Sequence, residues 1–85
     1  MSNRFLDAKE ASLYTYRTLG KLIGTSSVAA VHLVHDPGRA KDPEKILKLA
    51  SFLHMSEDEA TEEWKFLRAK HLRQLAERKI RKEDL

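Results

Sequence analysis

The chain has 85 residues, which is enough for one small domain, and it contains no cysteine, which excludes disulfide frameworks, thiolate metal sites and cysteine nucleophiles. Hydrophobic residues make up 41% of the sequence and charged residues 34%, a balance that predicts a modest core under a highly charged surface. The formal net charge is only +3, but the charges are segregated: residues 57–63 hold five acids and no bases, whereas residues 65–82 hold eight bases and one acid.

The amino-terminal part of the chain predicts three short helices. Residues 4–12, RFLDAKEAS, place apolar side chains at roughly helical spacing and predict a first helix that closes the core. Thr15 is suited to capping a second helix over residues 16–23, and Ser26 is suited to capping a third over residues 27–34. The two later helices are separated by only a few residues, so we expect them to meet at a tight corner.

Two glycines define this corner. Gly24 can take the positive φ that ends a helix, and Gly20 lacks the side chain that would keep a second helix backbone away. Ala30 and Leu33 would then be buried against the second helix. The pattern predicts a helix-turn-helix.

The second half of the chain predicts two further helices. Residues 36–38, Asp-Pro-Gly, interrupt the third helix, and residues 42–44, Asp-Pro-Glu, start a fourth that reaches about Leu53. Ser56 followed by an acid three residues later forms a capping box, which opens a last helix. No glycine or proline follows, so this helix is expected to reach about Ile80.

The last helix carries two apolar stripes. The inner stripe, expected to pack on the other helices, consists of Ala60, Trp64, Leu67, His71 and Leu75. The outer stripe, favoured as a dimer contact, consists of Phe66, Ala69, Ala76 and Ile80. The alternative is that Phe66 is covered locally and the helix end frays. The basic run has two interpretations of comparable weight, a binding surface or a complement to the helix dipole.

The residues at the corner carry a resemblance to a known family. Apolar and small residues in the order Leu19, Gly20, Ile23, Gly24, then Ser26, Ala30 and Leu33, resemble the helix-turn-helix of lambda-repressor-like (Cro/Xre-type) DNA-binding regulators. The segment PEKILKLASFLHMS, residues 43–56, is similar to a second segment of that family. Together the two segments cover about residues 13–59.

The resemblance implies an all-α, lambda-repressor-like five-helix domain with an extended C-terminal helix. Residues 1–59 would form the helix-turn-helix DNA-binding part, and residues 60–85 would form the long C-terminal helix of the same single domain. It implies that the third helix enters the major groove of double-stranded DNA. The base-reading residues would be Ser26, Ser27, Val28, Val31 and His32. The phosphate-binding residues would be Arg17, Lys21, Arg39, Lys41 and Lys45, with Tyr16 also near the phosphates.

The third helix departs from the family in its polar side chains. Its sequence, SSVAAVHLVH, contains no Arg, Lys, Gln or Asn, the residues that usually discriminate between bases. Val28, Val31 and Val34 form an apolar edge that could instead contact a protein. The alternative is that these valines pack against the loop at Pro37, which is favoured for Val34 more than for Val28. Two hypotheses follow: a homodimeric transcriptional regulator of the Cro or short-repressor type, or a protein-interaction module on the same scaffold, such as an antitoxin or an accessory phage or plasmid factor.

The four histidines do not predict a metal site. His32 and His35 are three residues apart, but zinc needs three or four ligands in fixed geometry. His54 stands where the family often has glycine, so we expect it at a helix end, and His71 lies on the inner stripe. No catalytic triad or glycine-rich phosphate loop is present, so we expect neither an enzyme nor a cofactor. Without an apolar run suited to a signal peptide or a membrane span, the sequence predicts a cytoplasmic protein with no membrane partner.

Overall fold

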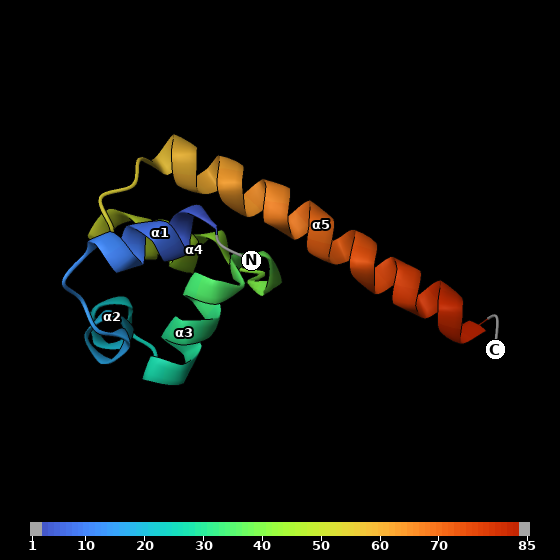
Figure 1. The fold of residues 1–85 in the computed structure, drawn as a ribbon, viewed down its shortest axis with the longest axis horizontal. Helices are drawn as coiled ribbons and strands as arrows, with labels where there is room; N and C mark the ends of the chain where they lie inside the picture. Colours follow the sequence, from blue (N-terminus) through green and yellow to red (C-terminus); the bar gives the residue numbers. More distant parts are fainter. Residues whose placement is uncertain (1–2, 84–85) are drawn as a thin grey trace.

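The computed structural model describes residues 3–83, with side chains described for residues 3–79. Within this range the chain forms α1 (Arg4–Ala11), α2 (Tyr16–Ile23), α3 (Ser27–His35), the short 3-10 helix η1 (Pro37–Arg39), α4 (Pro43–Phe52) and α5 (Glu57–Glu83). The first four α-helices gather into a compact cluster, and α5 runs along one side of the cluster and then extends beyond it (Figure 1). The predicted all-α class and long last helix are confirmed. None of the described helices has the length and apolar character needed to cross a bilayer.

Each predicted helix is present, and the predicted boundaries lie within one turn of the observed ones. The expected cap residues make the expected bonds: oxygens of Thr15, Ser26, Asp42 and Ser56 accept a hydrogen bond from a first-turn backbone amide at 3.0–3.2 Å. Such bonds satisfy amides that have no partner inside the helix. Local capping therefore explains why the helices begin where they do.

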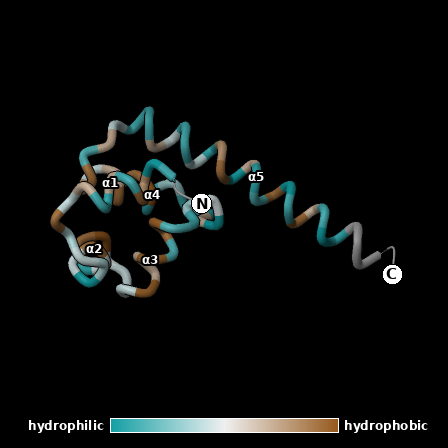
Figure 2. Tube along the Cα trace, viewed as in Figure 1, coloured by the Kyte–Doolittle hydropathy of each residue, from teal (hydrophilic) through white to brown (hydrophobic). Residues whose placement is uncertain are grey.

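The core lies where α1–α4 meet the first turns of α5. It contains Phe5, Leu19, Ala30, Val34, Ile46, Leu49, Ala50, Leu53, Met55 and Ala60. Figure 2 shows hydrophobic segments concentrated in the four-helix cluster, whereas most of α5 is hydrophilic. The inner stripe of α5 reaches this cluster only in its first half: Trp64, Leu67 and His71 are half-buried, but Leu75 is 45% exposed. The second half of α5 therefore extends past the core that holds the first half.

The contact between η1 and α5 depends on a close backbone approach. A Cβ atom at Gly38 would lie 2.5 Å from the carbonyl oxygen of Leu67, so only glycine fits there without a shift of the backbone. Trp64 Nε1 donates to the carbonyl oxygen of Ala40 at 3.0 Å, and Arg68 Nη1 donates to that of Gly38 at 3.1 Å. These contacts fix the segment after α3 against the middle of α5.

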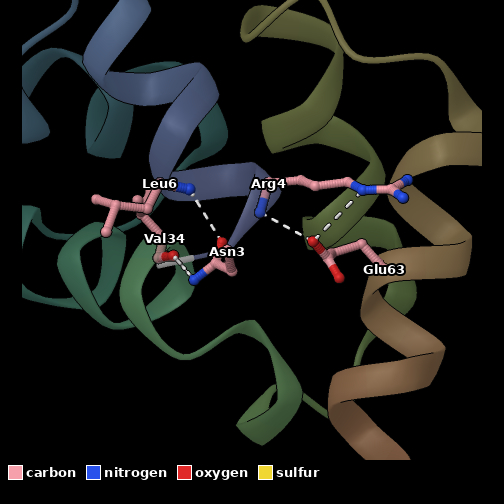
Figure 3. A network of polar contacts seen from close by, with 5 residues as sticks. All are labelled: Asn3, Arg4, Leu6, Val34 and Glu63. Carbon is pink, nitrogen blue, oxygen red and sulfur yellow. Dashed lines mark hydrogen bonds and ion pairs between the residues drawn. The ribbon is translucent and has the colours of Figure 1, made fainter. Parts of the chain in front are cut away.

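A second set of polar contacts joins the start of α1 to α3 and α5 (Figure 3). Asn3 Oδ1 accepts from the backbone amide of Leu6 at 2.9 Å, and Asn3 Nδ2 donates to the carbonyl oxygen of Val34 at 3.0 Å. The backbone amide of Arg4 donates to Glu63 Oε2 at 2.9 Å. Asn3 therefore caps the beginning of α1 and the end of α3 at once, which fixes the direction of α3.

Candidate nucleic-acid interface

The corner between α2 and α3 is built on the two glycines that the sequence indicated. Gly24 has φ 77°, in the left-handed region, and its backbone amide bonds to the carbonyl oxygens of Gly20 and Lys21. A Cβ atom at Gly20 would lie 2.8 Å from the carbonyl oxygen of Ser26 and 2.9 Å from that of Thr25. Both predictions are confirmed: Gly24 ends α2, and Gly20 lets the chain entering α3 pack directly on α2.

The packing of α3 leaves one of its faces accessible. Ala30 and Val34 are buried in the core, whereas Ser27 and His32 are exposed and Val28 is 65% exposed. Among the residues predicted to read bases, Val31 is half-buried. Ser26 is exposed, but its Oγ accepts the capping bond from the amide of Ala29 at 3.1 Å. The amino end and outer face of α3 therefore lie at the surface of the described molecule.

The predicted valine edge is shorter than the sequence suggested. Val34 is completely buried, so it is not part of a surface edge, and the alternative that it packs within the molecule is confirmed. The reason is helical periodicity, because Val34 lies one turn after Ala30 on the face that packs into the core. Of the three valines, only Val28 and part of Val31 are consequently accessible.

The five predicted phosphate-binding residues are all exposed and fall into two groups. Arg17 and Lys21 lie on α2. Arg39, Lys41 and Lys45 line a hollow of about 450 Å³ together with His32, which places three cations beside the outer face of α3. Arg39 Nε lies 3.9 Å from Asp36 Oδ2, but both groups are largely exposed, so this ion pair contributes little to stability.

Tyr16 is held by contacts within the protein, so its side chain is less available to bind a phosphate than an exposed side chain would be. Its hydroxyl lies 2.9 Å from His35 Nε2, and Lys9 Nζ lies 4.3 Å from the centre of its ring. Burial raises the pKa of Tyr16, and the nearby charge of Glu10 raises it further, so the phenol stays neutral. Tyr16 therefore joins the start of α2 to the end of α3, and the adjacent Arg17 is the better placed residue for an external anion.

The remaining histidines occupy different settings. His54 has φ 59° and is exposed at the end of α4, which confirms its expected place at a helix end. His71 is half-buried on α5 and lines a small hollow that His35 also lines. Among the described residues, no group of three or more potential ligands is arranged to hold a metal ion.

The proposed dimer stripe lies on the part of α5 that faces away from the core. Phe66 is 62% exposed, and Ala69 and Ala76 are exposed. The side chain of Ile80, the fourth member of the stripe, lies outside the described residues. The first half of α5 is packed against the core, but the ring of Phe66 is not covered by it. Phe66 therefore forms an apolar site on the surface of the described residues.

Two features of the surface were not predicted from the sequence. Asn3 was not singled out, although an Asn directly before a helix is a typical cap; its bond to Val34 spans 31 residues and no local pattern predicts it. Arg68 and Arg78 of α5 share a second hollow with Arg39 and Lys41. That grouping depends on how α5 crosses η1, which spacing within one helix does not determine.

The assembled surface combines an exposed helix end, two hydroxyl-bearing residues and a hollow lined by three cations and two carboxylates, Asp36 and Asp42. Comparison of the chain with protein-family models, curated proteins and solved structures found no match. In chemical terms, the surface suits a polyanion with hydrogen-bonding groups between its charges. It lacks a deep enclosed hollow among the described residues, and its cations lie at the rim of the accessible face of α3.

Proposed function

We propose that this chain is a small lambda-repressor-like transcriptional regulator of the Cro or short-repressor type, which places α3 in the major groove of double-stranded DNA as a homodimer. The observation that carries the proposal is the corner at Gly20 and Gly24, which holds α3 on α2 with its amino end and outer face accessible. A helix held this way can enter the major groove while the preceding helix crosses the backbone.

The accessible side chains of α3 would supply the contacts to bases. Ser27 and His32 can each donate or accept a hydrogen bond at a base edge. Val28, which is 65% exposed, can pack on the methyl group of thymine. Because no long amide or guanidinium side chain is present on α3, we expect modest base discrimination and a large share of affinity from the backbone contacts.

The two groups of cations would anchor the phosphates on either side of α3. Arg17 and Lys21 are exposed on α2, and Arg39, Lys41 and Lys45 line the hollow that His32 of α3 also lines. Each phosphate that they neutralise releases condensed counterions, which favours binding and makes it depend on salt. These contacts fix the orientation of the protein on the duplex without reading its sequence.

The homodimer would form through the outer stripe of α5, Phe66, Ala69, Ala76 and Ile80. Burial of an exposed Phe against a second copy favours association through the hydrophobic effect. Two reading helices related by a two-fold axis would meet successive major grooves about 34 Å apart.

The proposal is tested by titrating the protein into fluorescein-labelled duplex DNA at several salt concentrations. We expect binding to weaken steeply with salt, and the double variant Arg39→Ala with Lys41→Ala to reduce the slope of log K against log salt by about 2 for each protomer bound. The control removes a charge elsewhere, Lys65→Ala, and should leave the slope almost intact. Absence of salt-dependent binding by the unaltered protein would contradict the proposal.

A second candidate function is a protein-interaction module, such as an antitoxin or an accessory phage or plasmid factor. The exposed Val28 favours it, together with the lack of Arg, Lys, Gln and Asn on α3. Failure to bind heparin or random DNA, together with one stoichiometric protein partner, would favour this alternative.

A further inference from the structure

The segment after α3 and the second half of α5 enclose a groove of about 750 Å³, which we name the α5 groove. Its charged lining consists of Arg39, Lys41, Arg68 and Arg78, with one carboxylate, Asp36. The groove therefore has a clear excess of positive charge. A concave cationic surface concentrates anions more strongly than the same charges on a flat surface.

The α5 groove also has an apolar part. Leu72 and Leu75 of α5 line it, and each is close to half exposed. A small inorganic anion would gain nothing from these side chains. A ligand that alternates charge with hydrocarbon, such as a sugar-phosphate backbone, can contact both the cations and the leucines.

The α5 groove is continuous with the surface proposed to bind DNA. Arg39 and Lys41 line it and also line the hollow that contains His32 of α3. In Figure 1 the amino end of α3 and the far end of α5 both point toward the lower side of the molecule. The shared Arg39 and Lys41 therefore connect the hollow beside α3 with the groove along α5.

The cations of the α5 groove are held in place relative to α3. The backbone at Gly38 lies directly on α5, since a Cβ there would be 2.5 Å from the carbonyl oxygen of Leu67. Arg68 Nη1 donates to the carbonyl oxygen of Gly38 at 3.1 Å, and its guanidinium carries further N–H donors. The angle between α3 and α5 is thus set by packing, so the groove is part of the fold and does not depend on a loop closing.

We infer that the α5 groove binds the phosphodiester backbone of the DNA that flanks the site contacted by α3. This inference rests on the proposed function and extends it, because it assigns a binding role to the half of α5 that the core does not need. Arg78 and Arg68 would neutralise phosphates, and Leu72 and Leu75 would contact deoxyribose carbons. The basic run of α5 then acts as a second clamp on the duplex.

The test compares two cations of α5. Arg78 lines the α5 groove, whereas Lys65 is exposed, lies off the outer stripe and is not part of the groove lining. The probe is a fluorescein-labelled duplex of random sequence and about three helical turns, titrated at several salt concentrations. We expect Arg78→Ala to reduce the salt slope by about 0.9 for each protomer bound and the affinity at physiological salt by about five-fold, and Lys65→Ala to change both much less.

Other results would overturn the inference in distinguishable ways. If Arg17→Ala with Lys21→Ala weakens binding while Arg78→Ala does not, DNA binding stands and the α5 groove has no part in it. Equal losses for Arg78→Ala and Lys65→Ala would mean a diffuse effect of charge, which also overturns the assignment. If the unaltered protein does not bind the duplex, the proposed function fails and the inference fails with it.

Discussion

Gly20 lies where the backbone entering α3 passes closest to α2. The carbonyl oxygens of Thr25 and Ser26 occupy the space that a side chain would need, at 2.9 and 2.8 Å from the position of a Cβ. Backbone atoms at this distance cannot rotate away as a flexible side chain can, so a methyl group must push the two helices apart. The absence of a Cβ atom at Gly20 therefore determines the position of α3 relative to α2.

The first prediction concerns this position. Gly20→Ala should lower the free energy of unfolding by about 1–3 kcal/mol, the usual cost of overpacking. Gly24→Asn is the matched control: a Cβ atom at Gly24 would point into open space, with no described neighbour within 4 Å, and Asn tolerates the left-handed conformation better than most residues. Urea unfolding of both variants is the measurement. A Gly20→Ala variant as stable as the original chain would contradict the close approach.

At His54, in contrast to Gly20, a residue with a side chain occupies a backbone conformation that suits glycine better. Its φ of 59° places it in the left-handed region directly after α4, and the next amide, of Met55, bonds back to the carbonyl oxygen of Ala50 at 3.0 Å. This is the pattern of a Schellman cap, in which glycine usually holds the left-handed position.

We therefore predict that His54→Gly raises the free energy of unfolding by about 1 kcal/mol, after allowance for the extra entropy of glycine in the unfolded chain. His54→Ala keeps the Cβ and should bring no such gain. Both are measured by urea unfolding. A loss of stability in His54→Gly would show that the imidazole makes a stabilising contact that outweighs its backbone cost.

Among the helices, α5 is held by a few contacts to η1 that are distant in sequence. The indole of Trp64 donates to the carbonyl oxygen of Ala40 at 3.0 Å, and Gly38 packs against the backbone of α5. The helices themselves were predictable from local signals, because caps such as Thr15 and Ser26 and the turn at Gly24 act within a few residues. The junction of η1 with α5 was not predictable, because it joins residues 24 or more positions apart, and no periodicity within α5 indicates which loop it will meet.

Replacement of Trp64 tests this junction. Trp64→Phe keeps an aromatic ring but removes the donor, so we expect a loss of about 1–2 kcal/mol and faster amide hydrogen exchange at residues 38–41. Amides of α2 should keep their relative protection, which serves as the internal control. Unchanged exchange at residues 38–41 would mean that the indole bond does not hold the loop.

At the scale of the whole molecule, the chain consists of a compact four-helix cluster and a helix that extends past it (Figure 1). The residues predicted to read bases lie on or next to one helix, and most of them are exposed. Val34 is buried on the same face as Ala30, a placement that helical periodicity indicates. The α5 groove was not predicted because it forms only when α5 crosses η1. Periodicity indicates the faces of single helices, whereas a surface shared by several elements requires their relative placement.

The outer stripe of α5 leads to a prediction about assembly. Phe66 is 62% exposed and outside the core, so Phe66→Glu should leave the monomer folded while it places charge in the proposed dimer contact. Analytical ultracentrifugation should give the mass of a dimer for the original chain and of a monomer for this variant. Lys65→Glu, a neighbouring exposed position off the stripe, is the control. A monomeric original chain would remove the basis for two-fold binding.

The central claim, that α3 lies in a major groove, is tested most directly by amide chemical shifts of isotope-labelled protein titrated with duplex DNA. The account predicts that the largest changes fall on residues 26–32 and on the amides around Arg17 and Lys41, which surround the accessible face of α3. The claim would be contradicted if the amide shifts of residues 26–32 stayed constant while those of other surfaces changed. It would also be contradicted if no amide shift changed with excess duplex.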